Sequence, residues 1–295
     1  MNTNPLHNRL SPLLAESTDS EARLRFQPQS DCDIVEIAGR LHGPRCEYSR
    51  TLSAEYPLRQ IAGVAEVFVP EPCYWTPSLP FLYELSLAIR TGDGKVREYS
   101  QPVGLRRWAA AGANFRLNGR RTVLRGASVD TIAPEQLADV HLAEATLIVL
   151  NPNAALCAAA SRLGVSLIAD LRAVPHNLAQ SLAQLSWSPA VLLVLLDACQ
   201  LASPPLRNHA PSQLPLAQCL TAMAANTDLA QRQPDVLAVE LEANQRPPAW
   251  LSDSGKPIIV MRRGQTYTSF TDARRDCDRL QAELVPQFDL AGYFV

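Results

Sequence analysis

The spacing of hydrophobic positions changes once along the chain, near residue 110. Before that point, short stretches alternate apolar and polar residues, which is the pattern of strands with one buried face. After it, short continuous apolar runs alternate with segments of helical periodicity, which is the pattern of parallel strands covered by helices. The sequence therefore predicts a β domain followed by an α/β domain.

The first predicted domain is an immunoglobulin-like β-sandwich at 21–108, preceded by a loose polar tail at 1–20. Six short strands and a tight turn at Gly92-Asp93-Gly94 have the spacing of such a sandwich. We expect Trp75 and Tyr83 to pack in its core and against the next domain. The predicted strands are 24–26, 34–41, 47–52, 65–69, 83–89 and 96–100.

The second predicted domain is a compact (β/α)8 TIM barrel at 115–295, either complete or lacking its last elements. The sequence predicts seven strands with apolar runs and an eighth in the region 227–235. The predicted strands are 122–124, 145–150, 165–171, 190–196, 236–241, 257–261 and 290–295. The predicted helices are 134–142, 153–163 with Gly164 as its C-cap, 176–185, 213–225, a short one near Ala249, and 269–284.

Charge and composition exclude several classes of protein. The net charge of −2 and the absence of a basic block predict no nucleic-acid partner. No apolar stretch approaches the ~20 residues of a membrane helix, and no secretory signal is visible, so we expect a soluble, cytoplasmic protein. Its seven scattered cysteines form no C-x-x-C pair and its five histidines are isolated, which predicts free thiols and neither metal nor cofactor.

Three motifs in order carry a family resemblance: WTPSLPFLY at 75–83, VGLR at 103–106 and FRLNGRRTVLRG at 115–126. This series resembles glycoside hydrolase family 2, in which it marks the end of an immunoglobulin-like domain and the entry into a catalytic TIM barrel. The resemblance implies a retaining glycosidase, which needs two carboxyl groups about 5 Å apart at the ends of the barrel strands.

Both catalytic glutamates of that family are replaced in this chain. The segment SPAVLLVLLDAC at 188–199 aligns with the family's general-acid motif and places Cys199, or with one residue of slip Ala198, at the glutamate. The segment GKPIIVMRRG at 255–264 aligns with the nucleophile motif and places Arg262 at the second glutamate. A guanidinium cannot attack an anomeric carbon, so the resemblance predicts a catalytically degenerate protein.

Other positions also depart from the family pattern. Asp130 stands where the family has a histidine, and the arginine and histidine expected before Asn151 are missing. The chain stops at Val295, before a pocket tryptophan. The carbohydrate-pocket candidates that remain are Asp130, Asn151, Asp170, Asp197, Glu240, Glu242 and Arg262.

Three functions stay open on the sequence alone. The favoured one is a family 2-like pseudoenzyme of carbohydrate metabolism that binds a carbohydrate or a protein partner. The second is an active β-glycosidase with a displaced pair of Asp197 and Glu240 or Glu242. Against this pair, we expect Arg262 or Arg263 to hold Glu240 ionised rather than leave it a proton donor. The third is a structural subunit, a homo- or hetero-oligomer joined through an open barrel end around Phe294 and Val295.

Overall fold

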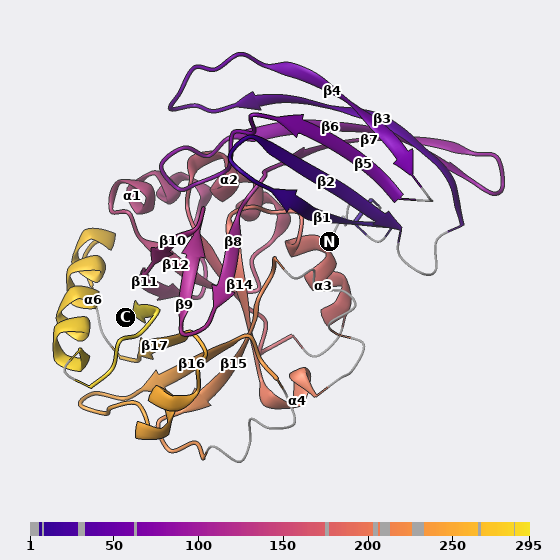
Figure 1. Cartoon of the computed structure of the whole chain (residues 1–295). Helices are drawn as coiled ribbons and strands as arrows, with labels where there is room; N and C mark the ends of the chain where they lie inside the picture. Colours follow the sequence, from indigo (N-terminus) through magenta and orange to yellow (C-terminus); the bar gives the residue numbers. More distant parts are fainter. Residues whose placement is uncertain are drawn as a thin grey trace.

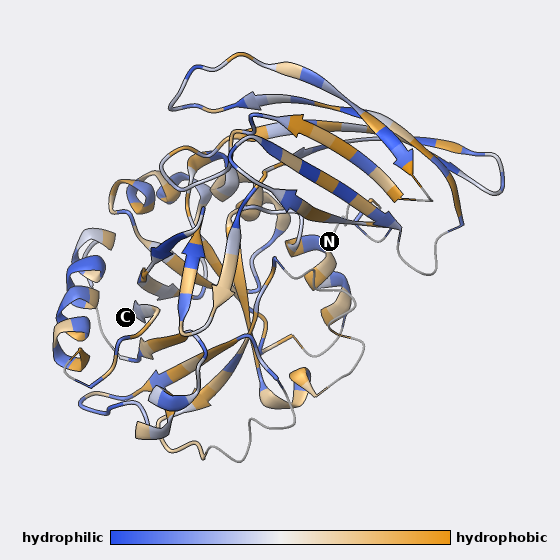
Figure 2. Cartoon of the chain, viewed as in Figure 1, coloured by the Kyte–Doolittle hydropathy of each residue, from blue (hydrophilic) through white to orange (hydrophobic). Residues whose placement is uncertain are grey.

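The structure is a computed structural model with a curled β-sheet packed on a barrel (Figure 1). It describes residues 6–7, 9–28, 33–61, 64–174, 177–202, 206, 213–225, 233–264, 267–285 and 287–295. The sheet comes from the first third of the chain and the barrel from the rest, as the change in hydrophobic spacing predicts. Hydropathy follows the same division, since strands of the sheet alternate in colour and barrel strands are mostly apolar (Figure 2).

The first part is a seven-stranded antiparallel sheet in the order β1-β2-β5-β4-β3-β6-β7, folded over a core of its own. Alternate residues are buried in strands such as β2 and β6, so each strand presents one face to that core. The strands are β1 (Leu10–Ser17), β2 (Glu21–Pro28), β3 (Ile34–Arg45), β4 (Ala54–Ile61), β5 (Val64–Pro70), β6 (Leu82–Thr91) and β7 (Val96–Val103).

Strand β4 joins the two halves of the sheet, β1-β2-β5 on one side and β3-β6-β7 on the other. Its first half, up to Pro57, pairs with β3, and its second half, from Leu58, pairs with β5. Proline has no backbone N–H and is tolerated in a sheet where a ladder ends. Pro57 lies at the change of partner, which explains how a proline is accommodated in a strand that is not at an edge.

Two predictions about this part are wrong. Residues 1–20 are not simply a loose tail, because β1 pairs along its length with β2 and buries Leu10 and Leu14. Pro12 makes this segment look unlike a strand, because proline cannot donate to a sheet ladder. It is acceptable on β1 because β1 is an edge strand. The strand predicted at 47–52 is a loop, and the chain becomes extended again only at β4.

A small three-stranded sheet leads from the first part into the barrel. It consists of β8 (Trp108–Ala111), β9 (Asn114–Leu117) and β10 (Arg120–Thr122), joined by tight turns. Trp108 and Phe115 stack at a centroid distance of 4.9 Å and are buried. Residues 109–114, which lie between the two predicted domains, are therefore part of an ordered element.

The barrel consists of eight parallel strands and is closed, because β18 pairs with both β17 and β11. It is the predicted (β/α)8 architecture. Its strands are β11 (Leu124–Val129), β12 (Thr146–Leu150), β13 (Leu167–Asp170), β14 (Val191–Leu196), β15 (Leu216–Thr221), β16 (Val236–Leu241), β17 (Ile258–Arg262) and β18 (Gly292–Phe294).

Helices follow most of the strands. They are η1 (Pro134–Gln136) continued by α1 (Leu137–Leu142), α2 (Ala154–Leu163), α3 (Leu178–Leu185), α4 (Ala198–Leu201), η3 (Ala249–Asp253) and α6 (Phe270–Leu284). Asn153 caps α2 through its side chain, and Gly164 ends it in the left-handed conformation, as predicted. The helix predicted at 213–225 is wrong, since this segment forms the fifth barrel strand, β15. The eighth strand predicted at 227–235 falls mostly on 226–232, outside the described residues.

Barrel closure removes the reason for expecting an open, apolar end. Phe294 is fully buried and Val295 is 5% exposed, and the backbone of Val295 bonds that of Gly126 and Ser128. The patch predicted around these two residues is therefore absent.

The two parts meet along a continuous seam in which side chains of the first part donate to backbone oxygens of the barrel. The buried guanidinium of Arg106 bonds the carbonyl oxygens of Pro189, Val191 (2.7 Å) and Gln213 (3.1 Å). The indole N–H of Trp75 donates to Ser161 O at 2.8 Å. Trp75 is fully buried, which confirms its predicted role at the seam.

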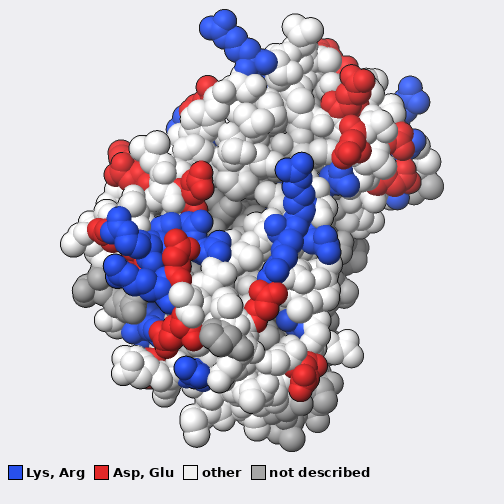
Figure 3. All heavy atoms as spheres, turned by 60° about the vertical axis from the view of Figure 1, so that its left-hand side comes forward, with Lys and Arg blue, Asp and Glu red and all other residues white. Residues whose placement is uncertain are grey.

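The surface over α6 carries charges of both signs (Figure 3). Several arginines on this helix pair with acids three or four residues away, for example Arg275 with Asp272 and Arg279 with Asp276. No helix among the described residues is long and apolar enough to cross a bilayer.

Candidate functional site

The carboxyl ends of the barrel strands form the rim where barrel enzymes place their chemistry, here called the barrel mouth. Asp170 is the last residue of β13, Asp197 follows β14, and Glu240 lies one residue before the end of β16. Strand direction and register therefore bring three of the predicted acids to the mouth. The charge that organises them comes from a residue that the sequence analysis did not single out.

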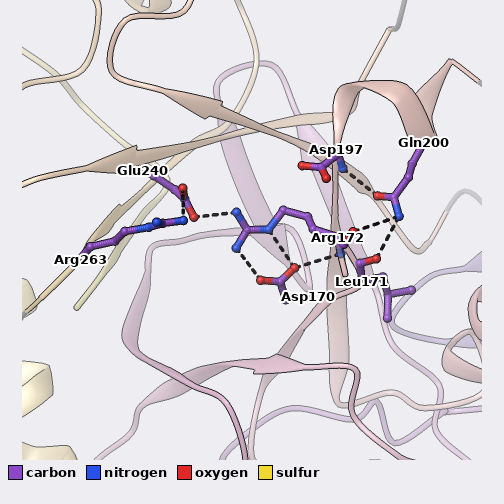
Figure 4. Close-up of polar contacts among 7 residues, drawn as sticks. All are labelled: Asp170, Leu171, Arg172, Asp197, Gln200, Glu240 and Arg263. Carbon is purple, nitrogen blue, oxygen red and sulfur yellow. Dashed lines mark hydrogen bonds and ion pairs between the residues drawn. The ribbon is translucent and has the colours of Figure 1, made fainter. Parts of the chain in front are cut away.

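Arg172 lies between two of these acids (Figure 4). Its Nε and Nη2 donate to Asp170 Oδ1 and Oδ2 at 2.9 and 2.6 Å, a bidentate contact, and its Nη1 donates to Glu240 Oε1 at 2.6 Å. Arg263 donates to the other oxygen of Glu240. We call these four residues, Asp170, Arg172, Glu240 and Arg263, the arginine clamp.

The arginine clamp holds Glu240 ionised. Burial alone would raise the pKa of Glu240, but the hydrogen bonds from Arg263 and Arg172 outweigh burial and lower it below its usual range. The hydrogen bond to Asp170 raises the pKa of Arg172, and that to Glu240 raises the pKa of Arg263. This confirms the expectation that an arginine would hold Glu240 as an anion.

Gln200 fixes the loops on either side of Arg172. Its side-chain oxygen accepts from the backbone N–H of Asp197 at 2.8 Å, and its Nε2 donates to the carbonyls of Leu171 (3.1 Å) and Val174 (3.2 Å). The segment after β13 is thereby tied to the start of α4. Asp197 is half-buried at the N-terminal end of α4, and its backbone N–H is the group that Gln200 binds (Figure 4).

Arg262 does not face the barrel mouth. Its Nη1 and Nη2 donate to Glu283 Oε2 and Oε1 of α6 at 2.7 and 2.9 Å, and its side chain is only 9% exposed. Successive residues of a strand point to opposite faces, so Arg263 is the one that reaches Glu240. The expectation that Arg262 places a cation in the pocket is wrong, and Arg263 together with Arg172 supplies that charge instead.

The remaining candidates lie around the mouth but outside the clamp. Asp130 and Glu242 are exposed residues directly after β11 and β16. Asn151 follows β12, is exposed, and has a positive φ of 42°; its backbone N–H donates to the carbonyl of Asp170. Cys199 is an exposed thiol on α4, so the position matched to the family's general acid holds no carboxyl group.

A half-buried thiol also lies near the acids of the mouth. Cys219 of β15 lies close enough to Asp170, Arg172, Asp197 and Glu240 to feel their charges, and its pKa is raised chiefly by burial. Among the residues that the structure describes, no group of three or more His, Cys, Asp or Glu side chains has the arrangement of a metal site.

The only feature of the sequence that pointed to Arg172 is its position two residues after Asp170, an acid that ends a strand. Glu240 is far away in sequence, so its pairing with Arg172 follows from barrel closure. Gln200 carried no signal, because its role depends on the backbone carbonyls of a neighbouring loop.

Comparison with solved structures gives the fold a family context. A glycosyl hydrolase family 2 member from Bacteroides cellulosilyticus superposes with a TM-score of 0.67 at 16% identity, covering 97% of this chain and 43% of that one. The β-glucuronidase of Bifidobacterium dentium gives 0.66 at 15% identity, covering 97% and 59%. The β-glucuronidase of Bacteroides uniformis gives 0.67 at 13% identity, covering 97% and 45%.

No protein-family model and no curated protein sequence matches the chain. The chain spans about half the length of the solved structures it resembles. At 12–17% identity the likeness concerns the fold. The curled sheet and closed barrel of this chain are those of glycoside hydrolase family 2 structures.

Proposed function

We propose that this protein is a catalytically degenerate, family 2-like protein of carbohydrate metabolism that binds a carbohydrate at the barrel mouth without hydrolysing it. The supporting observation is the arginine clamp. Both oxygens of Asp170 and both oxygens of Glu240 are already bonded to guanidinium groups. The proposal takes its ligand class from the fold alone, since several neighbours are glucuronidases.

The clamp opposes glycoside hydrolysis for a chemical reason. A retaining mechanism needs one protonated carboxyl group beside the leaving oxygen and one ionised carboxylate beside the anomeric carbon. Glu240 has a lowered pKa and is a poor proton donor at neutral pH. Its lone pairs are directed to Arg172 and Arg263, which weakens it as a nucleophile as well.

The test is turnover of aryl β-glycosides (galactoside, glucuronide and mannoside) by the purified chain. We expect no release of the aryl alcohol above that of a buffer control, and we expect methyl β-glycosides to bind in titration calorimetry. Glu240→Gln should weaken this binding, whereas Glu283→Gln, on the outer side of the barrel, should not. Robust turnover would reject the degenerate function, and absence of all glycoside binding would reject the carbohydrate ligand.

The second candidate function is an active β-glycosidase that uses Asp197 and Glu240. It is favoured by one observation: Glu240 is kept ionised, as a nucleophile must be, and Asp197 follows a strand on the same rim. If turnover is found, Asp197→Ala and Glu240→Ala should each abolish it. Unchanged rates in both variants would reject this pair.

We also propose a cytoplasmic location, supported by the six free cysteines among the described residues, a pattern of reducing compartments. Labelling with a membrane-impermeant thiol reagent in intact and lysed cells tests it. Self-association of the chain into an oligomer remains a prediction. A monomer in sedimentation at micromolar concentration would reject that prediction.

A further inference from the structure

Arg106 is a buried cation whose bonds to the described residues go only to uncharged groups. It lies at the seam, in the segment between β7 and β8, and is 8% exposed. Its Nη1 and Nη2 donate to the main-chain oxygens of Pro189, Val191 and Gln213, which carry no formal charge. Buried charges are normally paired with an opposite charge, because an unpaired one has lost its hydration without an equal replacement.

The pKa of Arg106 reflects the same imbalance. Burial lowers the pKa of its guanidinium to about 9, and no carboxylate of the described residues opposes this effect. Arg172 at the barrel mouth is also partly buried, but there the hydrogen bond to Asp170 raises the pKa. At pH 7 the guanidinium of Arg106 is still protonated, so its charge is present and lacks an acidic partner.

Two N–H groups of this guanidinium remain available. A guanidinium has five N–H donors, and the three carbonyls use three of them. The Nε–H and one N–H of Nη2 have no acceptor among the described residues. The Nε of Arg262 is unpaired too, but it is fully enclosed, whereas the Nε of Arg106 is not. The Nε of Arg106 therefore keeps surface that a ligand can reach.

A cavity of about 40 Å³ adjoins Arg106. Its walls come from β1, β2 and the end of β7, and from the segments that precede β14 and β15. Among the described residues that line it, Arg106 is the only one with a formal charge. A single water needs roughly 10–15 Å³ by this measure, so the cavity has room for a monatomic ion and none for a sugar. Val191 is the first residue of β14, so the cavity lies at the end of the barrel opposite the mouth.

We propose that this cavity binds one small inorganic anion of the size of chloride, which accepts from the Nε–H of Arg106 and balances its charge. No acidic side chain in the described lining repels such an ion. The walls come from both parts of the chain, so a bound anion stabilises the association of the curled sheet with the barrel. This site is independent of the carbohydrate proposed for the barrel mouth.

Thermal unfolding of the full chain tests the anion dependence. Sodium bromide replaces sodium gluconate at constant ionic strength, because gluconate is too large for the cavity while screening stays equal. We expect Tm to rise by about 2 °C or more when bromide reaches about 200 mM. Arg106→Gln removes the charge and should abolish this rise. Arg107→Gln removes the neighbouring charge, which pairs with Asp19, and should preserve it.

Crystals of the wild-type chain grown in bromide test the location, and they decide the matter even if Arg106→Gln does not fold. We expect an anomalous scattering peak for bromide beside the Nε of Arg106. A cavity that is empty or holds only water, or an equal bromide dependence of Tm in Arg106→Gln and wild type, would overturn the proposal. A peak without any bromide dependence of Tm would mean binding at crystal concentration only, and would overturn it as well.

Discussion

Replacing Arg172 by methionine should destabilise the protein by about 3 kcal/mol at pH 7. The variant keeps an aliphatic stem but removes the guanidinium that bonds both oxygens of Asp170 and one of Glu240. The side chains of Asp170 and Glu240 are only 11% and 17% exposed. Breaking a buried ion pair by removing one partner costs about 3–5 kcal/mol, and the lower end applies because Glu240 keeps Arg263.

The assay is scanning calorimetry at pH 7, where this loss corresponds to a fall in Tm on the order of 6 °C or more. Arg279→Met is the control, since Arg279 is 72% exposed and paired with Asp276 on the surface of α6. Exposed pairs of this kind contribute about 0–1 kcal/mol, so its Tm should change little.

The difference between wild type and Arg172→Met should also depend on pH. The folded-state pKa of Glu240 lies below its unfolded value of about 4.3, so its contribution to stability is present above that pH and is lost as pH falls through the folded pKa. With one of its two donors removed, the variant has less of this contribution to lose. The gap in Tm should therefore narrow between pH 5 and pH 3. A variant within 1 °C of wild type at pH 7, or a gap that does not change with pH, would refute the clamp as a stabilising unit.

Two further predictions concern the backbone and the thiols. Gly164→Ala should lower the free energy of unfolding, measured by urea denaturation, by at least 2 kcal/mol, because φ is +75° and the new Cβ would overlap the carbonyl oxygen of Pro77. Gly94→Ala, with φ of +78° and open surroundings, should lower it by only about 1 kcal/mol. Equal costs would show that the Pro77 contact is unimportant. At pH 8 a thiol reagent should modify exposed Cys199 in the folded chain but spare Cys157 and Cys277, whose pKa values burial raises to about 12 and about 11. Mass spectrometry of the labelled peptides gives the answer, and early modification of Cys157 would contradict its burial.

The sequence predicted the barrel well where strands are continuously apolar and helices have clear ends. The apolar run of β14 and the Asn153 and Gly164 caps of α2 are local signals. The segment of β15 contains Leu, Ala and Gln, which are good helix formers, so propensity alone favoured the wrong structure. Pairing with β14 and β16 in a closed barrel decides its conformation, and that is a tertiary effect.

The candidate site was predicted in part. The acids at the ends of β13, β14 and β16 could be found because parallel strands present their carboxyl ends at one rim. The direction of Arg262 could not be found from the alignment, because a shift of one residue along a strand exchanges the inner and outer faces. Its contact with Glu283 depends on how α6 lies against β17.

The seam between the curled sheet and the barrel has a consequence for how the sequence can diverge. Arg106, Trp75 and Tyr48 all donate to main-chain oxygens of the barrel, those of Val191, Ser161 and Leu163 among them. A peptide carbonyl is present whichever side chain a residue carries, so Val191, Ser161 and Leu163 can be substituted without losing these three acceptors. At these three contacts the requirement for a particular side chain falls on the donor in the first part, whereas Gln213 and Arg162 of the barrel contribute by their own side chains, to Leu14 and Glu47. Contacts of this kind survive mutation of the residues that supply the carbonyls, in keeping with a shared architecture at 12–17% identity.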